Sequence, residues 1–227
     1  MPHFGLSWAR IKEHFRVRAP IYIVGIIICL LMTNLLYTTT APTPPSNQVV
    51  TIYLTDSATD PDPLEEVAAD ALAYGQTIDE TLVEVGFESI SYSNSESDYY
   101  SVMVLVARLS TGDGDVFFAS ADAADYLIRA EAFEPLDDYL DAGWMEGLDL
   151  EPYYYTSDET GETYIAALSL ENVTGLDELN AFTTEGAYLI IAANGTNIDT
   201  SMEVTEYIVR TLMEGDYAST ESTESAD

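Results

Sequence analysis

Residues 99–119 read YYSVMVLVARLSTGDGDVFFA, and this stretch decides the class of fold. Residues 99–110 place apolar side chains at helical spacing, the TGDG motif predicts a turn, and DVFFA at residues 115–119 predicts a short buried strand. The predicted helix is expected to bury three side chains: Val102, Val106 and Leu109. A helix that leads at once into a buried strand is typical of an α/β domain.

The same alternation continues toward the N-terminus. Residues 49–54 (VVTIYL) are β-branched and predict a strand, and residues 87–92 (FESISY) alternate with a period of two and predict another. Between them, a helix is predicted from apolar residues at helical spacing: Leu64, Val67, Ala68, Ala71, Leu72, Ile78, Leu82 and Val85. We expect Gly75 to interrupt this helix.

The pattern also continues toward the C-terminus. We predict a helix over residues 121–131, strands over residues 164–170 and 188–193, and a last helix that begins with a capping box from Thr200 to Glu203. Residues 133–155 are predicted to be rich in loops. The whole pattern predicts a three-layer, single-lobe α/β domain with a mainly parallel sheet, preceded by one transmembrane helix.

The expected transmembrane helix is the apolar run at residues 21–37, IYIVGIIICLLMTNLLY. It holds 17 residues without a charge, and as a helix it would extend about 26 Å, at the short end of what a bilayer needs. Arg10, Lys12, Arg16 and Arg18 precede it, and no Lys or Arg follows it before Arg108. The positive-inside rule then predicts a cell-membrane protein with a single span, a cytoplasmic N-terminus and an extracellular C-terminal domain.

Two other interpretations of the apolar run were considered. The TTTA stretch before Pro42 is a poor signal-peptidase site, and Cys29 follows three isoleucines rather than the small residue of a lipobox. We therefore expect an uncleaved anchor. The predicted segments are a basic cytoplasmic segment (1–20), the transmembrane helix (21–37), a Thr/Pro-rich stalk (38–48), the α/β domain (49–215) and a disordered acidic tail (216–227).

Composition limits the chemistry of the domain. Residues 1–37 carry four basic residues and Glu13, a formal charge of +3, whereas the remainder carries 39 acidic residues and three arginines, a charge of −36. Such a charge repels nucleic acid. After residue 37 the chain has no Cys and no His, which excludes Ser-His-Asp and Cys-His catalysis and the usual zinc sites. We expect no enzyme activity and no cofactor. A glycosidase carboxylate pair carries little weight, because among 39 acids some will be close by chance.

Three segments resemble parts of a known family. They are YYSVMVLVARLSTGDGDVFF at residues 99–118, AFEPLDDYLD at residues 132–141 and ETYIAALSL at residues 162–170. In this order they resemble bacterial extracellular solute-binding proteins of ABC transporters, in the sugar and oligosaccharide branch with the type II periplasmic-binding fold. Such proteins close two lobes on their ligand. Here about 20 residues separate residue 170 from the strand at 188, so the resemblance implies a single lobe with an open groove.

Candidate ligand-binding residues follow from the predicted sheet. In open α/β sheets, ligands lie beyond the carboxyl ends of the strands, and the resemblance points to the same two loops. These loops contain Asp56 and Ser57 after the first strand, and Ser120 and Asp122 after DVFF. Asp56 and Ser120 could hydrogen-bond a sugar; alternatively Ser120 or Asp122 caps its helix and Asp56 stabilises a turn.

Aromatic residues and acidic clusters give weaker indications. Trp144, with the tyrosines at residues 153–155, could stack on a sugar ring or could fix the loops by packing. The carboxylates at positions 56, 60 and 62, and those at 113 and 115, are oxygen-rich, but neither set matches a calcium loop. We expect both sets to be solvated turns and predict no metal site.

Two functions are compatible with the sequence. The first is a membrane-anchored module that binds a sugar or another small polar solute weakly, accessory to an ABC transporter or acting as a sensor. Its expected partners are the membrane, a transporter permease or another surface protein, and not nucleic acid. The second is a surface interaction or structural domain that retains the fold without binding a ligand.

Overall fold

The computed structural model describes residues 8–40, 44–93, 99–112 and 114–215. The chain divides into two compact units, residues 1–43 and residues 44–227. Helix α1 (Trp8–Thr40) belongs to the first unit and includes the predicted anchor and the first part of the predicted stalk. Within the described ranges, no helix has the length and apolarity needed to cross a membrane. The predicted tail, residues 216–227, lies outside the described residues.

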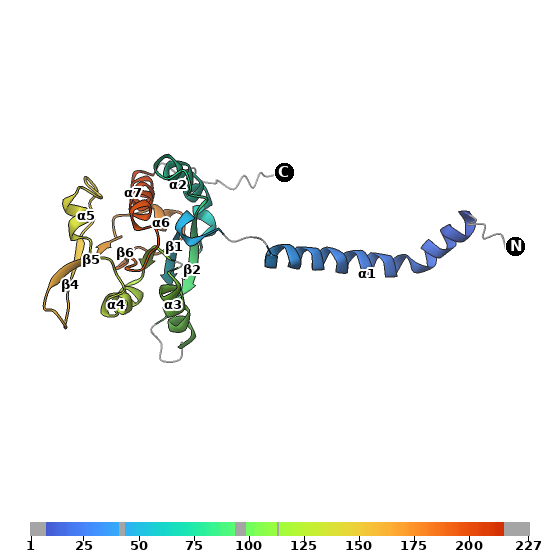
Figure 1. Cartoon of the computed structure of the whole chain (residues 1–227), viewed down its shortest axis with the longest axis horizontal. Coiled ribbons are helices and arrows are strands. Elements are labelled where there is room, and N and C mark those ends of the chain that lie inside the picture. Colours follow the sequence, from blue (N-terminus) through green and yellow to red (C-terminus); the bar gives the residue numbers. More distant parts are fainter. Residues whose placement is uncertain (1–7, 41–43, 94–98, 113, 216–227) are drawn as a thin grey trace. The chain divides into compact units, whose positions relative to one another are not determined.

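The second unit is a single α/β domain built on a six-stranded mixed sheet (Figure 1). Its strands are β1 (Val49–Asp56), β2 (Glu84–Ser91), β3 (Val116–Ala119), β4 (Pro152–Thr156), β5 (Thr163–Ser169) and β6 (Tyr188–Ile191). Its helices are α2 (Glu65–Ile78), α3 (Tyr99–Thr111), α4 (Ala121–Arg129), α5 (Asp137–Asp141), α6 (Gly175–Glu178) and α7 (Ile198–Glu214). Two 3-10 turns, Ser46–Gln48 and Asp62–Leu64, precede β1 and α2.

The strand order is β2-β1-β3-β6-β5-β4. Strand β1 pairs in parallel with β2 and β3, as predicted, but β3–β6, β6–β5 and β5–β4 are antiparallel. The expectation of a mainly parallel sheet is therefore wrong. Parallel neighbours need a long crossover, and the connection from β5 to β6 contains only the four-residue helix α6. The prediction that the late strand joins the same sheet is confirmed.

Helices cover both faces of the sheet, which confirms the three-layer expectation. Alternate residues of β1 point to opposite faces: Leu54 belongs to the apolar cluster under α2 and α7, whereas Tyr53 belongs to the cluster under α3 and α4. Figure 1 shows α2 and α7 together on one side of the strands and α3 and α4 on the other. The β1 side chains Ile52, Tyr53 and Leu54 are at most 1% exposed.

Several element boundaries differ from the prediction. Helix α2 passes through Gly75 without interruption and ends at Ile78. Leu82 and Val85 are buried, but Leu82 lies in the turn that follows the helix and Val85 lies in β2. In α3 the buried residues are Ser101 and Leu105, and Val106 is 41% exposed. Helix α7 begins after Asn197, two residues before the predicted cap. Strand β4 occupies the end of the stretch predicted to be loop-rich and extends one residue beyond it.

Candidate functional site

Strands β1 and β3 end side by side, and this brings four of the five predicted ligand-binding residues to one end of the sheet. Thr55 is paired with Ala119, and the backbone N–H of Ser120 donates to the Thr55 carbonyl at 3.0 Å. Asp56 and Ser57 follow on β1, and Ser120 and Asp122 follow on β3. We call this region the carboxyl end of the sheet; it also includes Ser91 of β2, which pairs with Asp56.

The side chains at the carboxyl end are only partly used by the fold. The Ser57 N–H donates to Asp56 Oδ1 at 2.6 Å, which agrees with the alternative role of Asp56 in stabilising a turn. Ser120 occupies the N-cap position of α4, but its hydroxyl makes no capping hydrogen bond. Asp122 is exposed in the first turn of α4, where a carboxylate is favoured by the helix dipole.

Two aromatic residues lie near the same end of the sheet, and one of them, Tyr188, packs with the cluster under α3 and α4. Tyr188, the first residue of β6, pairs with Ala119 across the sheet. Tyr153 of β4 meets the Tyr188 ring edge-on, with 5.2 Å between the ring centroids, and remains 38% exposed. The carboxyl end therefore holds a carboxylate and hydroxyls, with an aromatic pair nearby at the same end of the sheet. Tyr188 was not proposed for this end of the sheet from the sequence, although the strand predicted over residues 188–193 begins with it.

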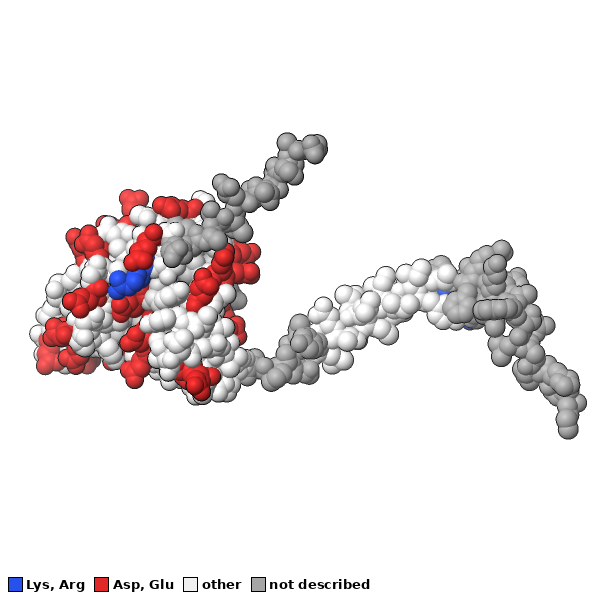
Figure 2. All heavy atoms as spheres, turned by 90° about the horizontal axis from the view of Figure 1, so that it is seen from above, with Lys and Arg blue, Asp and Glu red and all other residues white. Residues whose placement is uncertain are grey.

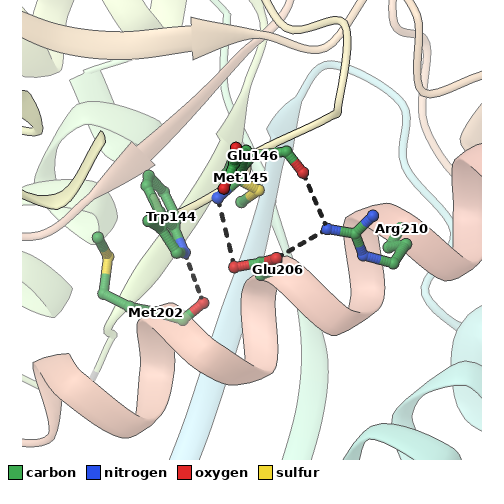
Figure 3. A network of polar contacts seen from close by, with 6 residues as sticks. All are labelled: Trp144, Met145, Glu146, Met202, Glu206 and Arg210. Atoms are coloured by element: carbon green, nitrogen blue, oxygen red, sulfur yellow. Dashed lines mark hydrogen bonds and ion pairs between the residues drawn. The ribbon is translucent and has the colours of Figure 1, made fainter. Parts of the chain in front are cut away.

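Trp144 lies away from the other four predicted residues. It is 8% exposed, and its indole N–H donates to the Met202 carbonyl of α7 at 2.9 Å (Figure 3). Glu206 accepts a hydrogen bond from the Met145 N–H at 3.3 Å and pairs with Arg210 at 2.8 Å. These contacts fix the turn after α5 against α7, so Trp144 serves the packing role that we considered as the alternative.

A cleft of about 460 Å³ opens beside Trp144, and we call it the α7 cleft. It is lined by residues of α2, of the segment that includes α5, and of α7: Ile78, Tyr139, Ala142, Gly143, Trp144, Asp199, Thr200, Met202, Glu203 and Glu206. Burial, and then the charges of Glu134 and Asp199, raise the pKa of the Tyr139 hydroxyl. The α7 cleft therefore joins apolar and aromatic walls to carboxylates.

The two predicted acidic clusters differ in how far their carboxylates are buried. Asp60 accepts a hydrogen bond from the Asp62 N–H at 3.1 Å, as in a local turn. Asp113 lies outside the described residues, whereas Asp115 is 3% exposed, so the expectation of a solvated turn is wrong for Asp115. Among the described side chains, no group of three or more His, Cys, Asp or Glu is arranged to hold a metal ion.

Burial raises the pKa of Asp115 from 3.8 to about 6, and hydrogen bonds to its carboxylate oppose this shift. The Thr51 N–H donates to its Oδ2 at 3.4 Å, and the backbone N–H groups of Thr196 and Asn197 also favour the ionised form. Gly195 packs so closely that an added Cβ would lie 3.1 Å from Asp115 Oδ1. The carboxyl is thus enclosed at the start of α7.

Acidic side chains are spread over the face of the domain seen in Figure 2. The three arginines of residues 44–227 each pair with a carboxylate: Arg108 with Glu88, Arg129 with Asp125, and Arg210 with Glu206. The exposed acids elsewhere on the domain therefore have no lysine or histidine of the same domain to neutralise them.

No family model matches the chain, and no curated protein matches it. Among solved structures, the N-glycan transport solute-binding protein NgtS of Streptococcus pneumoniae is similar to part of the chain, with 22% identity and a TM-score of 0.33. The similarity covers 52% of this chain and 24% of that protein, so the chain matches about a quarter of its length. A similarity of this size supports no argument about function.

Proposed function

We propose that the domain binds a sugar or another small polar solute, weakly, at the carboxyl end of the sheet. The observation that carries this proposal is the adjacency of Asp56 and Ser120, which the pairing of β1 with β3 and the Ser120 to Thr55 hydrogen bond fix in place. Tyr188 of β6 lies at the same end of the sheet, and its side chain packs with the cluster under α3 and α4.

The chemistry of this surface suits a polyhydroxylated ligand. A carboxylate accepts hydrogen bonds from neighbouring sugar hydroxyls, and a serine hydroxyl both donates and accepts. A larger saccharide could also reach the exposed ring of Tyr153, which packs against Tyr188 and offers an apolar face for the C–H side of a sugar ring. Asp56 and Ser120 belong to a single domain with no second lobe described to close over a ligand, so little ligand surface can be buried there. We therefore expect dissociation constants in the high-micromolar range or weaker.

The test is titration of the full chain, in detergent, with a panel of mono- and oligosaccharides, followed by NMR or calorimetry. Asp56→Asn and Ser120→Ala should each weaken binding of a sugar hit at least fivefold, because the first removes the charge and one acceptor oxygen and the second removes the hydroxyl. Glu159→Gln in the β4–β5 turn is the matched control for loss of one charge. Equal affinities for all variants, or no saccharide binding at millimolar concentration, would contradict the proposal.

We also propose that residues 21–37 attach the protein to the cell membrane, with the N-terminus inside and the domain outside. The support is the uncharged run in the sequence, its four basic neighbours, and exposed apolar side chains on α1 such as Ile21 (69%) and Leu30 (66%). Alkaline extraction should leave the protein in the membrane, and protease added to intact cells should remove the domain. Release by alkali would contradict the anchor. In this setting the domain would be accessory to a transporter or would act as a sensor.

A second candidate function is a surface interaction domain, and the exposed face of α3 favours it. Tyr99 and Tyr100 are 74% and 77% exposed, and Met103 is 53% exposed. Contiguous exposed apolar side chains mark interaction surfaces. If Tyr99→Ser/Met103→Ser abolishes an association of the protein on the cell surface while saccharides never bind, this second function replaces the first.

A further inference from the structure

We propose that the α7 cleft is a second binding site, independent of the carboxyl end, and that it binds an organic cation with an apolar body, such as an arylalkylammonium. The cleft has the volume of a small-molecule site, about 460 Å³. The carboxylates of the cleft can pair with the ammonium group, and its apolar and aromatic side chains can pack against the apolar body of the ligand.

The carboxylates of the cleft lack a cation. Asp199 and Glu203 are four residues apart on α7 and exposed, so their Cβ atoms lie about 5–6 Å apart on one face of the helix. Within the described residues neither side chain has an ion pair or a hydrogen bond, and all three arginines of the domain pair with other carboxylates. Two like charges at this spacing repel each other. A bound ammonium group would relieve this repulsion.

A buried polar group supports the same position independently. Thr200 lines the cleft and is only 7% exposed, and among the described residues its hydroxyl has no hydrogen-bond partner. Its oxygen is not among the fully enclosed atoms that lack a partner, so it is reached from the cleft and is open to a ligand's hydrogen bond. A ligand N–H placed between Asp199 and Glu203 can donate to this hydroxyl, which explains why a polar side chain faces the cleft.

The apolar walls select for an organic cation over a metal ion. Ile78 is 46% exposed at the end of α2, and Tyr139, Trp144 and Met202 also line the cleft. Aromatic rings attract cations and pack against aryl or alkyl groups. Glu206 is less available for a ligand, because it already pairs with Arg210 and accepts from the Met145 N–H. The negative field of the domain adds to the attraction of any cation.

The experiment uses the fluorescence of Trp144. Trp8 is the other tryptophan in the chain, so the Trp8→Phe variant of the full chain, in detergent, leaves Trp144 as the reporter. Titration with 2-phenylethylammonium should change the Trp144 emission in a saturable way, and the affinity should fall as NaCl is raised. The neutral analogue 2-phenylethanol should bind at least tenfold more weakly.

Two double variants of equal charge distinguish binding in the α7 cleft from general attraction of a cation to an acidic protein. Asp199→Asn/Glu203→Gln should raise the dissociation constant at least tenfold, whereas Asp158→Asn/Glu159→Gln, which removes the same charge from the β4–β5 turn, should change it less than twofold. Thr200→Val tests the hydroxyl by itself, and melting curves check that each variant folds. Equal weakening by the two double variants, equal binding of the alcohol, or no saturation at millimolar concentration would each overturn the proposal. Because saccharides are the probes at the carboxyl end, failure here leaves that proposal intact.

Discussion

Single residues decide how the stability of this domain depends on pH, and one of these is Asp115 with its buried carboxyl. Its folded pKa of about 6 lies above the ordinary value of 3.8, because burial disfavours the charged form. In the interval between these values the folded state binds more protons than the unfolded state. Stability from this group is therefore fully present below pH 3.8 and is lost as the pH rises through 6.

Asp115→Asn should remove this part of the pH dependence. The loss in the unmodified protein between pH 3.8 and neutral pH is on the order of 3 kcal/mol, since each unit of pKa shift corresponds to about 1.4 kcal/mol. The difference in unfolding free energy between variant and unmodified protein should therefore shift in favour of the variant by roughly 2–3 kcal/mol from pH 4 to pH 7.5. Urea denaturation at the two pH values measures this shift. Parallel pH profiles would show that the carboxyl is not buried as described.

At the scale of elements, the contact between α2 and α7 depends on Gly75. A Cβ added there would lie 2.5 Å from Leu82 Cδ2 and 3.0 Å from Val204 Cγ2. In an exposed helix, replacing glycine with alanine would gain about 1 kcal/mol. In this contact, overpacking costs about 1–3 kcal/mol. Overpacking should therefore outweigh the gain in helix propensity.

Gly75→Ala is accordingly expected to lower the unfolding free energy by about 1 kcal/mol, measured by urea denaturation. Leu82→Ala makes room for the new methyl group, so adding Gly75→Ala to that variant should be neutral or stabilising. A double-mutant cycle with these two changes isolates the clash. If Gly75→Ala stabilises the unmodified background, the helices are not packed as closely here as the structure shows.

The same helix shows what could be predicted from the sequence and what could not. Helical spacing correctly placed a helix before β2, but the apolar pattern continued through Leu82 and Val85, which are buried by a turn and by a strand. Spacing identifies that a side chain is buried and not which element buries it. Strand β4 was missed because Pro152 and the exposed Tyr154 lack the alternation of a half-buried strand.

For the candidate sites too, local features could be predicted from the sequence and contacts between distant segments could not. The proximity of Asp56 and Ser120 could be predicted, because strand ends are local features and parallel neighbours bring them together. The burial of Asp115 could not be predicted, because residues 195–201, about 80 positions later, enclose it. For Trp144 the sequence left stacking on a ligand and packing of loops as alternatives, because the partner that fixes it, Met202, is 58 residues away.

At the scale of the whole molecule, the acidic charge acts on every element at once. Residues 44–227 carry 39 acidic residues and three arginines. Repulsion among exposed carboxylates is relieved on unfolding, when the charges move apart, so it destabilises the compact state. Salt screens this repulsion, because the Debye length falls from about 10 Å at 0.1 M to about 3 Å at 1 M.

The unfolding free energy should therefore rise as NaCl is increased from 0.1 M to 1 M. A variant in which five exposed acids that belong to neither the α7 cleft nor the carboxyl end are neutralised provides the control: Glu66→Gln, Asp70→Asn, Asp158→Asn, Glu159→Gln and Glu162→Gln. Because each exposed charge contributes a small repulsive energy, this variant should be more stable at low salt and should respond less to added NaCl. Urea denaturation at four salt concentrations gives both slopes. If the slopes are equal, NaCl acts through the apolar core rather than through the carboxylates, and the acidic surface does not limit the stability of this domain.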